Sequence, residues 1–183
     1  MDPLDQLIPA YDIRERHEIL VSASAQSVYD ACMRVDLGDL PLIRAIFWLR
    51  ALMMGASKTG SSRSGGFVTE MRRIGWGILI EEPGRLLVAG ANCQPWHGDV
   101  VFTPRTAADF REFSEPEQVK IAWTLEVEPV TPMRTRLSTE TRAVATDGVA
   151  RRKFRRYYPL VRTGIVLIRW LMLRAVKRTA ERG

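Results

Sequence analysis

The chain has 183 residues, of which 46% are hydrophobic and 26% are charged, a composition typical of a soluble globular protein. Its length suffices for one domain, and no shift in composition marks a linker, so we expect a single domain over residues 1–183. Two cysteines, Cys32 and Cys93, exclude a disulfide scaffold. The acidic N-terminus lacks the pattern of a secretory signal, so we expect a cytoplasmic location.

The net charge of +6 arises at the end of the chain. Residues 148–183 contain 11 Lys or Arg residues and one acidic residue, Glu181, whereas the rest of the chain is net acidic. Such a cluster indicates either a surface for anionic partners or the solvated face of a helix that lies on an acidic body, and we favour the solvated face. The residues assigned to that face are Arg151, Arg152, Arg155, Arg156, Arg162, Arg169, Arg174, Lys177, Arg178 and Arg182.

Residues 11–21 alternate between apolar and charged side chains, which predicts a half-buried strand. His17 and Glu15 fall on its inner face. Ser24 is the expected N-cap of a helix over 25–36. A second helix is predicted over 42–54, and a mobile loop follows over 55–66. That loop matches neither a phosphate-binding P-loop nor a serine-nucleophile elbow.

Strands are expected next over 67–74, 76–81 and 86–91, with a tight turn at 82–85 because Pro and Gly occupy its centre. A short strand at 100–103 and a loop or helical turn around 109–113 follow. The clearest strand begins at Val119, where Trp123 and its alternate neighbours point one way. Another strand is predicted over 134–145. On it Thr139 lies on one face, whereas Glu140 and Arg142 share the other and pair with neighbouring strands.

Residues 148–183 are predicted to form one long amphipathic helix. Its apolar stripe recurs at steps of three and four and consists of Phe154, Tyr158, Val161, Ile165, Ile168, Met172 and Ala175. Arginines inside the stretch offset its apolar residues on an insertion scale, so a membrane span is not expected. Interfacial contact with a membrane remains an alternative.

The order of strand, two helices, antiparallel strands and long terminal helix resembles the START-like, or SRPBCC, superfamily. The segments most similar to it are RERHEILVSASAQSVYDA, KIAWTLEVEP and the block from TRLSTETRAVATDGVARRKFRRYYPLVRTG into IRWLMLRAVKRTAE, which resembles uncharacterised bacterial members. The resemblance spans residues 13–182. It implies an α+β helix-grip fold, in which a curved antiparallel sheet wraps around the C-terminal helix and leaves a cavity between them.

The resemblance also implies which residues line or close that cavity. They are Phe47, Trp76, Trp123, Thr139, Phe154, Tyr158, Val161 and Ile165, and His97 is added to these expected ligand-binding residues because of its position beside Trp96. The same side chains are equally able to fill the interior and leave no room for a ligand. His97 follows Trp96 at a strand entrance, where it is either a ligand contact and proton donor or a surface-loop histidine, and we favour the latter. His17 is either a pocket group or a hydrogen-bonded core residue, and we again favour the latter.

We therefore expect a non-catalytic protein that binds an apolar small molecule or lipid. One alternative is an enzyme of the polyketide cyclase or dehydratase type, in which His97 or His17 moves a proton. A second alternative is a protein attached to anionic membranes through its basic helix. No cofactor is expected, and Cys93 with His97 gives too few ligands for zinc. Nucleic acid is not an expected partner, because no recognisable nucleic-acid-binding module is present.

Overall fold

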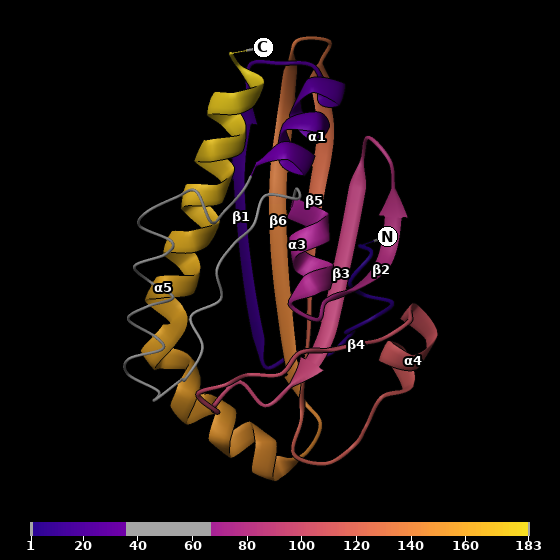
Figure 1. Ribbon diagram of the computed structural model, residues 1–183, viewed down its shortest axis with the longest axis vertical. Coiled ribbons are helices and arrows are strands. Elements are labelled where there is room, and N and C mark those ends of the chain that lie inside the picture. Colours follow the sequence, from indigo (N-terminus) through magenta and orange to yellow (C-terminus); the bar gives the residue numbers. More distant parts are fainter. Residues whose placement is uncertain (1, 36–66, 183) are drawn as a thin grey trace.

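The computed structural model describes residues 2–35 and 67–182. Figure 1 shows the chain with its elements labelled. They are, in chain order, β1 (Ile13–Val21), α1 (Ala25–Arg34), α3 (Phe67–Arg73), β2 (Gly77–Glu82), β3 (Leu86–Cys93), β4 (Thr103–Pro104), α4 (Ala107–Glu112), β5 (Val119–Thr131), β6 (Arg134–Ala145) and α5 (Gly148–Ala180). The predicted helix over 42–54 and the predicted loop over 55–66 lie outside the described residues.

The six strands form one antiparallel sheet in the order β1-β6-β5-β3-β2, with β4 paired to β3. Helix α5 runs along the edge at which β1 lies, and α1 and α3 lie on the same side of the sheet (Figure 1). We call this side the inner face. The α+β class and the long terminal helix expected from the sequence are confirmed.

The two long central strands match the prediction closely. Trp123, Leu125 and Val127 alternate along β5 and join the main core cluster together with Leu137 of β6. The opposite side chains of both strands are also largely buried. The sheet is therefore covered on both faces, whereas the alternation of apolar and charged residues suggested one solvated face.

The cover on the outer face comes from the N-terminal segment, which we define as residues 2–8, and from α4. Leu4, Leu7 and Ile8 are fully buried and form a second core cluster with Phe110 and with the outward side chains of the sheet. The remaining members of that cluster are Leu79, Leu86, Val88 and Ala122. No regular structure was expected for this segment.

The predicted strand over 67–74 is wrong, because these residues form helix α3. Val68 and Met71 lie three residues apart and both pack on the inner core, which only a helix allows. The helix ends in a Schellman motif, in which Trp76 N donates to Met71 O (2.9 Å) and Gly75 N donates to Arg72 O (3.1 Å). The strand expected at 100–103 is also displaced, since β4 contains only Thr103 and Pro104.

We expect Gly75→Ala to lower the free energy of unfolding by about 3 kcal/mol or more. Gly75 has φ +98°, and a Cβ there would lie 2.3 Å from the backbone oxygen of Phe102. Gly84→Ala is the matched control, because Gly84 also has positive φ (+81°) but its Cβ would meet nothing closer than 3.6 Å. The control should cost about 1 kcal/mol in urea unfolding. Equal costs for the two variants would contradict the predicted clash.

Helix α5 begins at an N-cap, Asp147, whose side chain accepts from Ala150 N (2.7 Å). Pro159 lies inside the helix and cannot donate the usual backbone hydrogen bond, and Figure 1 shows the helix changing direction along its length. Near its end, Lys177 Nζ donates to Leu20 O (2.7 Å). Ser22 N donates to Glu181 Oε1 (2.7 Å), so the helix is attached to the end of β1.

Candidate functional site

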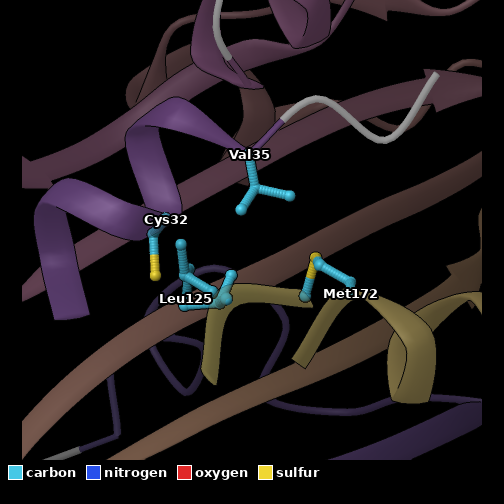
Figure 2. A pocket seen from close by; sticks show the side chains of 5 residues that line it. Cys32, Val35, Leu125 and Met172 are labelled. Atoms are coloured by element: carbon cyan, nitrogen blue, oxygen red, sulfur yellow. The ribbon is translucent and has the colours of Figure 1, made fainter. Parts of the chain in front are cut away.

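The space between α5 and the inner face is tightly packed at the end where α1 lies. Figure 2 shows Cys32 and Val35 from the α1 segment facing Leu125 of β5 and Met172 of α5. The gaps among these side chains and Val176 are too narrow for a water molecule. Burial raises the pKa of the Cys32 thiol to about 12, so this cysteine stays protonated in an apolar environment.

The opposite end of the same interface is closed by a smaller apolar cluster. Phe154 is buried against Val119 and Ala143, and its ring lies 5.7 Å from that of Tyr158. Trp96, from the loop after β3, packs partly against the same cluster. Both ends of α5 are thus fixed on the sheet by apolar contacts.

Between the two ends, the inner face of β1 and β6 is polar. Glu15 pairs in register with Thr141, and His17 pairs with Thr139, so the four side chains lie in two adjacent rows on one face. We call these four residues the inner polar patch. Three residues in the middle part of α5, Val161, Ile165 and Ile168, are only partly buried.

The Glu15 carboxylate accepts hydrogen bonds from two side chains of α5, of which one is charged. Tyr158 Oη donates to Glu15 Oε1 (3.0 Å), and Arg162 Nε donates to the same oxygen (2.7 Å). Burial acts to raise the pKa of Glu15, but the hydrogen bonds from Arg162 and Tyr158 outweigh it and lower that pKa. Burial, together with the hydrogen bond to Glu15, raises the pKa of Tyr158 to about 12. At neutral pH, Glu15 is therefore ionised and Tyr158 is protonated.

Arg169 contacts Thr141, the cross-strand neighbour of Glu15. Its Nη2 donates to Thr141 Oγ1 (3.0 Å), and its guanidinium carbon lies 5.3 Å from the centre of the Trp123 ring. Burial lowers the pKa of Arg169 to about 10, so the guanidinium is still charged at neutral pH. Trp123 in turn meets Trp76 edge to face, with ring centres 6.1 Å apart.

The second row of the inner polar patch contains two unsatisfied polar atoms. Thr139 is 1% exposed, and among residues 2–35 and 67–182 its Oγ1 has no hydrogen-bond partner. Nε2 of His17, the cross-strand neighbour of Thr139, is also buried and has no partner in the described part of the chain. The expectation of a hydrogen-bonded core histidine is therefore wrong for this nitrogen. An unsatisfied buried polar atom costs about 1–3 kcal/mol, so two adjacent ones need an explanation.

Most of the sequence-predicted ligand residues border this region. Trp123 and Thr139 are buried on the inner face, whereas Tyr158, Val161 and Ile165 follow one another along the covering helix. Trp76 contacts Trp123, and Phe154 closes the far end. Phe47 lies outside the described residues. His97 is exposed on the loop after β3, and its contact with a ligand stays a prediction.

Arg169 is a site residue that was not predicted, because its charge indicated the solvated face of the helix. Arg169 lies four residues after Ile165 and three before Met172, so the spacing of the apolar stripe already included its position. Arg162 occupies the equivalent position after Tyr158 and pairs with Glu15. Both arginines therefore occupy positions of the apolar stripe, and this spacing indicated that their side chains turn toward the sheet.

Two further findings concern residues 2–35 and 67–182 alone. In these ranges no three His, Cys, Asp or Glu side chains are grouped closely enough to hold a metal ion. None of the helices formed there combines the length and the apolar character that a membrane span requires.

No protein-family model matches the sequence, and no curated protein matches it either. Similar solved structures include a conserved protein from Geobacillus kaustophilus, at 8% identity and a TM-score of 0.46, with 93% of this chain and 96% of that chain covered. Norcoclaurine synthase from Thalictrum flavum, solved with dopamine and hydroxybenzaldehyde, is 14% identical with a TM-score of 0.45, and the match covers 91% of this chain and 84% of that one. An aromatase/cyclase from Streptomyces sp. R1128 is 14% identical with a TM-score of 0.34, over 93% and 94% of the two chains.

These scores are too low to support any argument about function. The fold assignment depends instead on the topology of this chain, in which an antiparallel sheet of order β1-β6-β5-β3-β2 packs its inner face against a C-terminal helix of 33 residues. Helix α1 follows the first strand as expected, and α3, which was not expected to be a helix, precedes the second strand. The chain therefore has a helix-grip fold.

Proposed function

We propose that this protein binds an apolar small molecule or lipid between the inner polar patch and the middle of α5, and that it acts as a carrier. The observation that supports this most directly is the pair of buried, unsatisfied atoms, Thr139 Oγ1 and His17 Nε2. They lie on the inner face, which α5 covers. A bound molecule with one polar group would satisfy them.

The surroundings have the composition of a small-molecule site. Such sites are mostly apolar, with a few polar groups that fix the orientation of the ligand. Here the apolar part is provided by Val161, Ile165 and Ile168, whose partial burial leaves surface for a ligand to cover. Trp76, which is partly buried and meets Trp123 edge to face, adds aromatic surface at the side of the patch.

The proposal is tested with the neutral probe N-phenyl-1-naphthylamine, whose fluorescence increases in apolar surroundings. We expect saturable binding at one site per chain. Ile165→Trp should weaken that binding about tenfold or more, because the larger ring occupies the ligand's space. Thermal unfolding of the variant shows whether it is folded, and Val161→Phe is a smaller change with the same expected direction.

Leu160→Trp is the matched control, because Leu160 is 69% exposed on the outward side of the same helix. It should leave the affinity for the probe unchanged. Absence of saturable binding by the unmodified protein would overturn the proposal. So would equal affinities for folded Ile165→Trp, folded Val161→Phe and Leu160→Trp.

A second candidate function is proton transfer on the bound molecule, as in a cyclase or dehydratase. It is favoured by His17, because a buried imidazole nitrogen without a partner is free to exchange a proton with a ligand. In this case a co-purified ligand would change chemically during incubation, and His17→Asn would retain binding but abolish the change. Mass spectrometry of the ligand distinguishes this enzyme from a carrier. Attachment to anionic membranes stays a prediction.

A further inference from the structure

The basic residues of α5 that turn toward the body of the protein differ in their partners. Four of them pair with a carboxylate: Arg151 with Asp12 (2.8 Å), Lys153 with Glu117, Arg162 with Glu15 (2.7 Å) and Lys177 with Glu181 (2.6 Å). Within residues 2–35 and 67–182, Arg169 pairs with no carboxylate. Its contacts there are the Thr141 hydroxyl and the face of Trp123.

No carboxylate of the described segments compensates the charge of this guanidinium. It is partly buried between helix and sheet, and burial has already lowered its pKa, which means that the charged form has lost favourable hydration. A hydroxyl and a ring face replace only part of that loss. Arg169 has several N–H donors besides the one given to Thr141, and the planar fork of a guanidinium matches the two oxygens of a carboxylate.

Further donors for the same ligand group lie close by on β6. Thr141 and Thr139 are two residues apart, so their side chains emerge from the same face about 7 Å from each other. Thr141 is already engaged by Arg169, whereas Thr139 Oγ1 and His17 Nε2 are unsatisfied. The charge of Glu15, which faces Thr141 across the strands, is compensated by Arg162 and does not stand alone against an incoming anion.

We infer that the molecule bound at this site is an amphipathic acid, whose carboxylate is bound by Arg169 and whose apolar chain lies along Val161 and Ile165. This inference depends on the proposed function, because it specifies the ligand of the same site. Thr139 and His17 then bind the second carboxylate oxygen or a neighbouring polar group of the ligand. The ligand carboxylate then provides a counter-charge for Arg169. The four basic residues of α5 named above obtain theirs from carboxylates of the protein.

The test compares decanoic acid with decanol by isothermal titration calorimetry at neutral pH, because the two molecules share a chain length and differ in the charged head group. We expect the unmodified protein to bind the acid about tenfold tighter or more. Arg169→Met should remove this preference, so that the variant binds acid and alcohol with equal affinity, since Met retains an apolar side chain of similar length but has no charge. Arg174→Met is the matched control, because it removes one positive charge from the exposed face of the same helix, and it should keep the preference.

The outcomes separate the two proposals. Equal affinities of the unmodified protein for acid and alcohol would overturn the inference and leave the proposed binding function intact. Persistence of the acid preference in Arg169→Met would also overturn it, since the carboxylate would then be bound elsewhere. Failure of both molecules to bind would overturn the binding function together with the inference.

Discussion

Replacement of Arg142 by methionine is expected to lower the free energy of unfolding by about 3–5 kcal/mol, because it removes the cation from a buried ionic cluster. The Arg142 side chain is 4% exposed and donates to Glu140 Oε1 (2.7 Å), Asp5 Oδ1 (2.7 Å) and Asp2 Oδ2 (2.6 Å). Arg14 is the second partner of Glu140 (2.9 Å). Without Arg142, the buried Glu140 carboxylate keeps Arg14 and Arg16, whose side chains are 43% and 45% exposed. Urea unfolding at pH 7 measures the effect.

Arg136→Met is the matched control for this cluster. Arg136 also lies on the outer face of β6, but its partners Glu128 and Glu18 are exposed, so the control should cost at most about 1 kcal/mol. Adding Glu140→Gln to Arg142→Met should restore part of the lost stability, because glutamine is uncharged and the double variant no longer buries a carboxylate without Arg142. If Arg142→Met and Arg136→Met prove equally stable, the cluster does not stabilise the fold.

Acid should weaken the same cluster. Burial acts to raise the pKa of Glu140, but the hydrogen bonds from Arg14 and Arg142 outweigh it and lower that pKa below the ordinary value of 4.5. A lowered carboxyl pKa in the folded state contributes stability above pH 4.5, and this contribution is lost as the pH falls through the lower folded value. Urea unfolding as a function of pH should therefore show a smaller loss of stability below pH 4.5 for Arg142→Met than for the unmodified protein.

The second large effect is expected at the N-terminal segment. Leu7 is 2% exposed in the outer core cluster, and Leu7→Ala should lower the free energy of unfolding by about 2–5 kcal/mol. Deleting residues 2–8 removes three buried side chains, each worth about 1.5–3 kcal/mol. Their sum approaches the whole stability of a typical domain, so the shortened chain should lose its cooperative unfolding transition. Circular dichroism during urea unfolding follows both variants.

Met133→Ala controls for the loss of an apolar side chain, because Met133 is 68% exposed in the turn between β5 and β6. It should change the free energy of unfolding by no more than about 0.5 kcal/mol. A shortened chain as stable as the unmodified protein would show that the segment is not part of the core.

The elements that could be predicted from the sequence are those whose side-chain period is unambiguous. Strand β6 spans the predicted residues, and β5 begins at the predicted Val119 because its apolar residues alternate without interruption. Ser24 accepts from Ser27 N as an N-cap should, and the turn at 82–85 includes Gly84 with positive φ. Helix α5 begins at the predicted Gly148 and ends within three residues of the predicted boundary.

The failures occurred where local signals were short or were outweighed by tertiary contacts. Helix α3 has seven residues, too few to show a helical period clearly, and its β-branched residues favoured a strand. The segment 2–8 has no regular period, and its burial depends on the outer face of a sheet formed far along the chain. Arg169 was assigned to solvent by its charge, although its position on the helix pointed inward.

The central claim is that the ligand lies between the middle of α5 and the inner polar patch. Isotope-filtered nuclear Overhauser spectra of the protein with bound N-phenyl-1-naphthylamine test it most directly, because they identify the methyl groups that contact the probe. We expect contacts to the methyl groups of Thr139, Val161 and Ile165. Contacts confined to exposed side chains such as Leu160 and Met133 would contradict the claim.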